Sequence, residues 1–395
     1  MSEHFFELIR VALGRKDALS AALSDDEWQQ MLQMAVRQTL VGVCFTGVER
    51  LPAGQRPPQD LLMLWYGLTR QIEERNRFMN HMTQQVADYF EGAGFEACIL
   101  KGQCNALLYP SPLRRQSGDV DVWVIPKGAD IAHWMENCEA VVRHVYAHCP
   151  EACFGHKHIE FPLWEDTVVE IHFYPSYLKN LLAHQRLLHF FSNHGSEQFS
   201  HFVHLDGEVK VVATPTVAFS LIFQLVHIFE HFITQGIGLR QVMDYFYLLR
   251  RLQEDAKPKI VEELNQLHLY SFASAMMWVL HHVLGLEEHF LLVQPDAQRG
   301  LVLLNDIMEG GNFGQFDTQR IRIGIRRSAY YIWKLRRLVR FFQYYPHEVL
   351  WDIPFRLYRR MWMLYASVRY SKVLTRTCGR QRTKTPGTTK IIGQR

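Results

Sequence analysis

The chain of 395 residues lacks several features that mark other classes of protein. It has no internal repeat, and 48% hydrophobic with 21% charged residues excludes a disordered chain, a collagen-like chain and a coiled coil. The N-terminal sequence MSEHFFELIR lacks the basic and then apolar pattern of a signal peptide. The seven cysteines are an odd number in a long chain, so we expect reduced thiols in the cytoplasm rather than a disulfide framework.

Uninterrupted apolar runs are also missing. Two uncharged stretches, residues 211–229 and 264–286, reach the length of a membrane span. Pro215, Gln224 and His227 interrupt the first, and five Asn, Gln and His residues interrupt the second. We therefore interpret both as buried helices and predict no transmembrane segment.

Acidic residues are scarce near the C-terminus. Residues 320–395 hold 19 of the 43 basic residues but only two of the 40 acidic ones, so the rest of the chain is acidic overall. Arginines alternate there with tyrosine, phenylalanine and tryptophan. Three interpretations stay open: docking onto the acidic remainder, contact with RNA, and peripheral contact with an anionic membrane surface.

Hydrophobic periodicity separates helical from mixed segments. Ser24 and Glu27 have the spacing of a capping box, and a helix is expected from about residue 61 to 91, before Gly92. Strands are expected near residues 97, 121, 158 and 170. The pattern predicts an α+β fold with a mixed sheet and helical regions before and after it. Its expected parts are a helical region over 1–92, a core over 93–212, a helical domain over 213–345 and a basic aromatic segment over 346–395 with a disordered end.

The segment GDVDVWV carries the strongest chemical signal. Alternate residues of a strand share one face, so Asp119 and Asp121 would lie side by side while the valines pack on the other face. Two adjacent carboxylates need a cation, and oxygen ligands suit Mg²⁺. A solvated strand end is the alternative interpretation of this motif.

Neighbouring segments extend this candidate site. Lys101 and Gly102 lie where a strand ends and a helix begins, a position that favours phosphate. Glu170, on a later strand, would supply a third carboxylate. Three carboxylates can hold two metal ions that clamp the attacking and leaving oxygens of a phosphoryl or nucleotidyl transfer.

Other polar residues have both a functional and a structural interpretation. Arg115 lies close enough to the acidic pair to reach a phosphate, or it belongs to a surface loop, and for Arg114 we favour a structural role. His158 and His172 would flank Glu170 on a hairpin, or be ordinary buried histidines. A zinc site is a weaker alternative because the cysteine spacing is poor; its candidates are His144, His148, Cys149, Cys153, His156 and His158.

A later helix begins with GLRQVMD. Arg240 and Asp244 stand four residues apart, so an intrahelical ion pair explains both. The alternative is that this helix closes over a nucleotide or acceptor and that both residues are accessory to the site.

The order of these motifs resembles the DNA polymerase β-like nucleotidyltransferase superfamily and, more closely, a bacterial family of uncharacterised nucleotidyltransferases. The resemblance covers roughly residues 60 to 365. It is carried by the segments ILKG (99–102), YPSPLRRQSGDVDVWV (109–124), His158, VEIH (169–172), GIGLRQVMD (236–244) and GGNFG (310–314).

The resemblance implies a function and a set of roles. NMP would pass from an NTP such as ATP to an acceptor, a small molecule, protein or RNA, with release of pyrophosphate. The implied metal ligands and catalytic residues are Asp119, Asp121 and Glu170. The implied nucleotide-binding residues are Lys101, Gly102, Arg115 and Gly118.

One departure from the superfamily pattern keeps other functions open. The superfamily usually follows its glycine with a second glycine and a serine, whereas here Gln103 and Cys104 follow Gly102. One alternative is a catalytically silent fold that binds a nucleotide or a partner protein. Another is an RNA-acting nucleotidyltransferase that holds RNA with the basic C-terminal segment.

Overall fold

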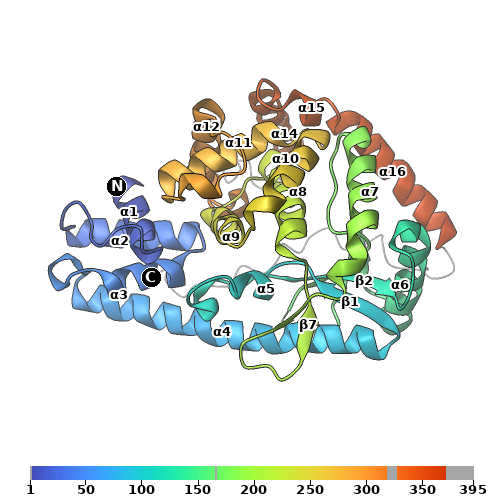
Figure 1. Ribbon diagram of the computed structural model, residues 1–395, viewed down its shortest axis with the longest axis horizontal. Helices are drawn as coiled ribbons and strands as arrows, with labels where there is room; N and C mark the ends of the chain where they lie inside the picture. The colour runs from blue at the N-terminus through green and yellow to red at the C-terminus, as the bar shows by residue number, and fades with distance from the viewer. Residues whose placement is uncertain (1, 165–166, 318–326, 371–395) are drawn as a thin grey trace.

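The computed structural model describes residues 2–164, 167–317 and 327–370 (Figure 1). Along the chain, helices precede the first strand, lie between strands and follow the last strand. In space, they cover both faces of a central sheet (Figure 1). The helices are α1 (Ser2–Ala12), α2 (Asp25–Arg37), α3 (Val41–Arg50), α4 (Gln59–Gly92), α5 (Gln103–Ala106), α6 (Trp134–His148), α7 (Leu181–Gln198), α8 (Val217–Thr234), α9 (Leu239–Leu249), α10 (Lys257–Gln266), α11 (Tyr270–Trp278), α12 (Ala297–Gly310), α14 (Arg327–Phe342), α15 (Pro346–Val349) and α16 (Asp352–Arg369).

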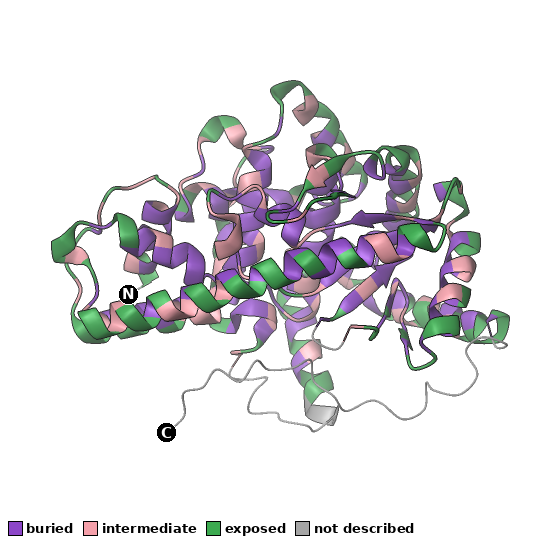
Figure 2. Ribbon diagram, turned by 90° about the horizontal axis from the view of Figure 1, so that it is seen from below, coloured by how far each residue is buried: buried purple, intermediate pink, exposed green. Residues whose placement is uncertain are grey.

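The N-terminal helices follow the signals in the sequence. Ser24 caps α2, with the side chain of Glu27 bonded back to the Ser24 backbone, which confirms the capping box. The long helix α4 ends at Gly92, where the chain reverses through Gly94 at a φ of 86°. Figure 2 shows α4 crossing the molecule with a buried stripe on one side and an exposed stripe on the other, as expected for an amphipathic helix.

The strands of the described residues form one seven-stranded mixed sheet in the order β3-β4-β5-β2-β1-β7-β6. β2 is parallel to β5 and antiparallel to β1, while β1 is parallel to β7. The bounds are β1 (Phe95–Ile99), β2 (Val120–Pro126), β3 (Cys153–Phe154), β4 (His158–Glu160), β5 (Val169–His172), β6 (Phe202–His204) and β7 (Val211–Ala213). The four predicted strands are β1, β2, β4 and β5, and the predicted α+β fold is confirmed.

The two faces of β2 have different environments. Trp123, on the face of Asp121, packs against Phe191 of α7 and Phe219 of α8. α4 lies on the opposite side of the sheet from α7 and α8 (Figure 1). The carboxylates of β2 therefore face the layer that contains α7 and α8.

The first uncharged run divides between strand β7 and helix α8. Among the described helices, α8 is long and apolar enough to cross a membrane, and 78% of it is buried inside the protein. The second run becomes the end of α10, then α11 and a π-helical turn over Val279–Val283. Both runs are thus buried, as predicted, except that β7 occupies the start of the first.

The C-terminal helix α16 docks by one face. Trp362 stacks on Phe154, and Lys179 pairs with Asp352 at 2.7 Å. Arg369 of α16 also pairs with Glu139 of α6, and Arg337 of α14 pairs with Asp306 of α12, so two basic residues of segment 320–395 dock onto acidic residues of the remainder. The polar end that we expected to be disordered lies outside the described residues.

Candidate active site

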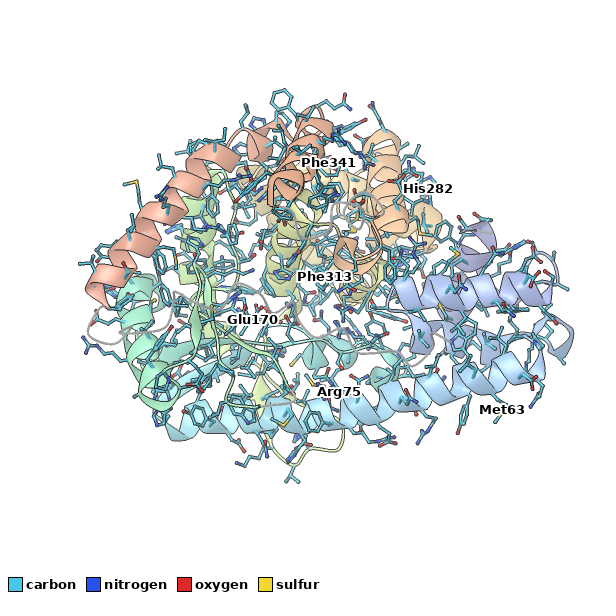
Figure 3. The ribbon with its side chains drawn as sticks, turned by 180° about the vertical axis from the view of Figure 1, so that it is seen from behind. Met63, Arg75, Glu170, His282, Phe313 and Phe341 are labelled. Atoms are coloured by element: carbon cyan, nitrogen blue, oxygen red, sulfur yellow. The ribbon has the colours of Figure 1, made fainter. Side chains whose placement is uncertain are left out.

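The three predicted carboxylates converge at the junction of β2 and β5. Asp121 and Glu170 are register partners in the parallel ladder, and Asp119 precedes β2. One oxygen atom from each of the three lies within 4.8 Å of the others. Asp121 is buried, whereas Asp119 and Glu170 are partly exposed, and Glu170 lies centrally in the molecule (Figure 3). The group therefore has a deep end and a solvent-facing end.

Lys101 and His172 contact these carboxylates. The ammonium of Lys101 lies 2.6 Å from Asp121 Oδ2 and 3.7 Å from Asp119 Oδ1. His172 Nε2 lies 3.0 Å from Asp121 Oδ1. Burial alone would raise the pKa of Asp121, but the charge of Lys101 and the hydrogen bond from His172 lower it to about 2. Asp121 is thus ionised at neutral pH.

The donor set fits a divalent cation. All three ligands are carboxylate oxygens, the type that Mg²⁺ prefers, and the 4.8 Å span allows one ion to contact each of them. The ammonium of Lys101 already neutralises Asp121, so Lys101 and a bound cation would compete for the same carboxylate.

His158 and His172 both reach Glu170, as the hairpin pattern predicts. His158 Nδ1 lies 3.1 Å and His172 Nε2 lies 3.5 Å from Glu170 Oε2. Burial lowers the pKa of His158 to about 4, so His158 is neutral at pH 7. Burial also opposes a charge on His172, but Asp121 and Glu170 raise its pKa. Both histidines therefore belong to the carboxylate group, with His172 as the bridge.

The wider zinc set does not assemble. His156 lies among aromatic side chains, with its ring 5.4 Å from those of Phe355 and Trp362. None of the possible metal-binding groups in the described part of the chain includes Cys149 or Cys153. Of the wider set, His158 belongs to such a group, together with Glu170 and His172 beside the carboxylates.

The turn at Lys101 and Gly102 lies where it was predicted, between a strand and a helix. The helix that follows it is short. Gly102 has φ 70° and ψ −111°, a conformation that other residues avoid, and α5 begins directly after it. α5 spans only four residues, so it contributes little helix dipole. Phosphate at this turn would therefore depend on Lys101 more than on the helix.

Arg115 and Asp244 form a buried ion pair. The guanidinium donates from Nε and Nη2 to the two carboxylate oxygens at 2.7 Å each, and Tyr109 donates to the same carboxylate at 2.6 Å. Arg115 is therefore buried and does not belong to a surface loop; Asp244 occupies its Nε and Nη2. A phosphate contact of Arg115 stays a prediction. The predicted intrahelical pair between Arg240 and Asp244 is wrong, because Asp244 pairs with Arg115 instead. Arg114 pairs with acidic residues of α3 and α4, which agrees with a structural role.

Arg240 approaches Gly118 instead. Its Nη1 donates to the carbonyl of Gln116 at 2.8 Å, and a Cβ at Gly118 would lie 3.6 Å from the same nitrogen. Within residues 2–164, 167–317 and 327–370, Arg240 forms no ion pair. Burial and the charge of Arg115 lower its pKa, while the charges of Asp244 and then Asp119 act in the opposite direction. This buried cation therefore lies beside the loop that leads into the acidic strand.

A second buried group lies nearby; the sequence shows the helical spacing of its two histidines, His227 and His231, but sequence reasoning missed its ion pair. Lys157 pairs with Glu230 at 3.2 Å, and Tyr177 donates to Glu230 at 2.9 Å. His227 and His231, one turn apart on α8, face each other at 3.1 Å between their Nε2 atoms. His227, Glu230 and His231 each offer one ligand atom within 4.8 Å of the others, so they form a second possible metal-binding group in the described part of the chain. Lys157 stands between His156 and His158 in the sequence, and this pattern does not indicate a pair with Glu230.

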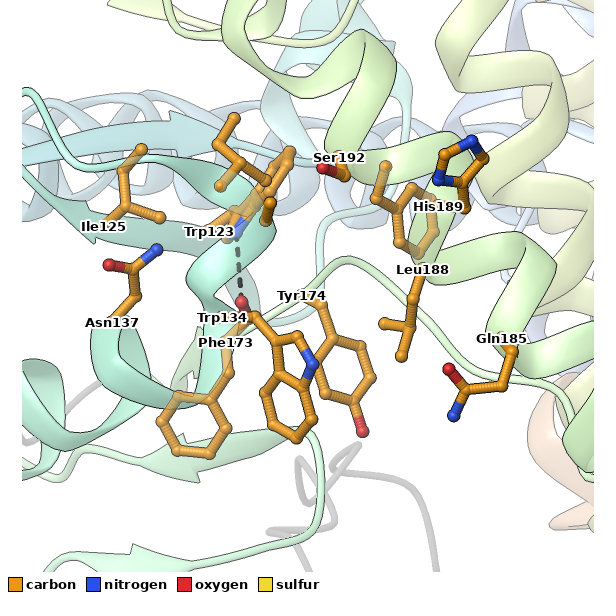
Figure 4. Close-up of a pocket in the computed structure, with 13 residues that line it drawn as sticks. Trp123, Ile125, Trp134, Asn137, Phe173, Tyr174, Gln185, Leu188, His189 and Ser192 are labelled. Atoms are coloured by element: carbon orange, nitrogen blue, oxygen red, sulfur yellow. Dashed lines mark hydrogen bonds between the residues drawn. The ribbon is translucent and has the colours of Figure 1, made fainter.

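A cavity of about 350 Å³ lies further along β2 (Figure 4). Trp123 and Ile125, on the face of Asp121, form one wall, and Trp134 and Tyr174 contribute aromatic rings. None of the predicted site residues lines it. The cavity is therefore separate from the carboxylate group.

Comparison with known proteins gives one match. A search of curated proteins and a search of solved structures each found no match. The family model described as "Uncharacterised nucleotidyltransferase" matches residues 24–285, which include the carboxylates, Lys101 and Arg240. The match covers most of the chain and the whole sheet. The chain therefore belongs to this family of uncharacterised nucleotidyltransferases.

Proposed function

We propose that the protein is a Mg²⁺-dependent nucleotidyltransferase that transfers NMP from an NTP to an acceptor hydroxyl and releases pyrophosphate. The observation that carries the proposal is the convergence of Asp119, Asp121 and Glu170 from β2 and β5. Family membership supports nucleotidyl transfer in general. The acceptor class is left open, because fold alone does not specify it.

The carboxylates have distinct roles in this proposal. Asp119, Asp121 and Glu170 would hold the metal, which when bound would stabilise the charge on the attacking and leaving oxygens. Burial opposes ionisation of Glu170, but His172 and His158 lower its pKa to about 2. A general base works best with a pKa near the operating pH. Glu170 is therefore suited to be a ligand rather than the base that activates the acceptor.

Two cations of the chain are suited to the NTP phosphates. Lys101 lies at the turn beside the carboxylates, and Arg240 lies beside Gly118 with no ion pair in the described part of the chain. Both are held on structured elements, so neither pays a large ordering cost on binding. We assign the phosphate contacts to Lys101 and Arg240, and a bracing role to Arg115.

The proposal is tested by pyrophosphate release from each NTP in the presence of Mg²⁺ and candidate acceptors. Turnover in the wild type and its loss in Asp119→Asn/Asp121→Asn would support the assignment. Asp255→Asn, an exposed carboxylate far along the chain, is the matched control and should keep activity. Equal turnover in the wild type and the double variant would contradict it.

A silent fold that binds nucleotide is the second candidate function. Gln103 and Cys104 replace the usual glycine and serine, and both are buried. The amide of Gln103 bonds to Asn80 at 2.5 Å, which turns it toward α4. Nucleotide binding without turnover under any acceptor condition would favour this candidate.

A further inference from the structure

α16 exposes a continuous apolar stripe along the edge of the molecule, beside α6 and α7 (Figure 1). The spacing of four, four, three and four residues places the whole set on one helical face. These side chains, which we call the α16 stripe, are 60% to 79% exposed: Ile353, Leu357, Met361, Leu364 and Val368. Scattered exposed apolar residues are normal, but a contiguous set of this kind marks an interaction surface.

The exposed charges of α16 itself are positive. Arg359, Arg360 and Arg369 are exposed on this helix, and Arg369 pairs with Glu139 of α6 at 3.0 Å. The acidic residues of segment 327–395 are Glu348 and Asp352, and both are buried. Glu348 accepts hydrogen bonds from backbone N–H groups, and Asp352 pairs with Lys179. The α16 stripe is therefore accompanied on its own helix by the exposed cations Arg359 and Arg360.

The preceding helix repeats the pattern. Tyr331, Leu335 and Val339 of α14 are exposed at a spacing of four residues. Lys334 of α14 lies close to Arg356 of α16, and burial together with that charge lowers the pKa of Lys334 to about 8. The two helices thus place several cations near one another. An anionic partner would reduce the repulsion between these cations.

These features discriminate between possible partners. A second copy of the chain would bring the same cationic surface against itself, which opposes association through this face. RNA would match the charge, and the exposed rings of Tyr331 and Tyr365 could stack on bases, but the five residues of the α16 stripe are aliphatic and offer no ring. An anionic bilayer matches both features: acyl chains accept the stripe and headgroups accept the arginines.

We propose that α16 is a docking surface for an anionic lipid membrane, on which the protein lies peripherally. In the sequence, segment 371–395 follows α16 and holds seven basic and no acidic residues. The proposal is independent of nucleotidyl transfer.

Vesicle sedimentation with the full-length protein tests the proposal. We expect binding to phosphatidylcholine vesicles that contain phosphatidylglycerol, little binding to phosphatidylcholine alone, and weaker binding at high salt. Arg359→Gln/Arg360→Gln should weaken binding about fivefold for each arginine. Leu357→Ser/Met361→Ser/Leu364→Ser should weaken it at least about tenfold.

The matched control removes similar apolar side chains elsewhere. Met63→Ser/Leu64→Ser changes two exposed residues of α4 and should leave vesicle binding unchanged. Unfolding midpoints should stay near the wild-type value in all variants, because the replaced side chains are exposed. Failure of the wild type to bind anionic vesicles would overturn the proposal. Binding by Leu357→Ser/Met361→Ser/Leu364→Ser that equals wild-type binding would also overturn it. A wild-type dimer that is lost in Leu357→Ser/Met361→Ser/Leu364→Ser would overturn it as well, because the stripe would then contact a second copy of the chain.

Discussion

The buried pair of Arg115 and Asp244 predicts a large and specific loss of stability. Replacing Arg115 by methionine keeps much of the side-chain volume but removes the charge. Among the described residues, Asp244 would then keep the hydroxyl of Tyr109 as a hydrogen-bond partner and the nearby charge of Arg240, in a site where the carboxylate is almost fully buried. Breaking a buried ion pair by removing one partner typically costs about 3–5 kcal/mol. We expect Arg115→Met to lower the free energy of unfolding by about this amount.

The neighbouring arginine provides the comparison. Arg114 pairs with Glu49 and Glu73 in a partly exposed setting. Such pairs usually contribute at most about 1 kcal/mol, so Arg114→Met should cost much less. Denaturant unfolding at pH 7, followed by circular dichroism, measures both changes.

A double variant separates the ion pair from the loss of side-chain packing. Arg115→Met/Asp244→Leu removes both charges and should recover most of the stability that Arg115→Met loses, because no unpaired carboxylate is left. If Arg115→Met unfolded at the same denaturant concentration as the wild type, the pair would not brace the fold. Arg115 would then be available for the nucleotide role that its sequence position indicates.

Three further variants test the site and its surroundings. Lys101→Met should lower stability in metal-free buffer by on the order of 2 kcal/mol, because Asp121 loses its cation. Mg²⁺ should raise the melting temperature of this variant more than that of the wild type. An equal rise in both would refute the view that Lys101 and a bound cation neutralise the same carboxylate. Gly102→Ala should cost about 1–3 kcal/mol from backbone strain alone, since the nearest atom to its Cβ is 3.6 Å away; an unchanged unfolding midpoint would contradict the backbone conformation. Burial raises the pKa of Glu348 to about 7, so the folded state holds its proton more tightly than the unfolded chain, and stability falls by up to about 4 kcal/mol as pH rises from about 4.3 to about 7. Glu348→Gln should remove this part of the pH dependence, as measured by unfolding at pH 5 and pH 8, and an unchanged difference in stability between the two pH values would refute the assignment.

Local patterns predicted much of the sheet and of the site. Alternation in GDVDVWV placed β2 and oriented Asp119 and Asp121, because the period of a strand fixes which side chains share a face. Glu170 was also predicted, since its segment reads as a strand and a third carboxylate completes the donor set. The short strands β3, β6 and β7 have too few residues to show a period, and we did not predict them.

Long-range partners were harder to predict than local structure. Asp244 stands four residues from Arg240, which suggests a pair within one helix, but it bonds to Arg115 from a distant loop. Lys157 and Glu230 similarly come from separate elements. Helical spacing constrains neighbours on one helix, whereas tertiary packing decides which of two arginines receives a carboxylate. The division of the chain into four parts stays a prediction.

The central claim is that Asp119 and Asp121 hold a divalent cation that is used with an NTP. Its most direct test is calorimetric titration of the wild type and Asp119→Asn/Asp121→Asn with NTP, with and without Mg²⁺. The account predicts Mg²⁺-dependent binding in the wild type that is lost in the double variant and kept in Asp255→Asn. Mg²⁺-dependent binding of equal affinity in the double variant, or no NTP binding by the wild type, would contradict it.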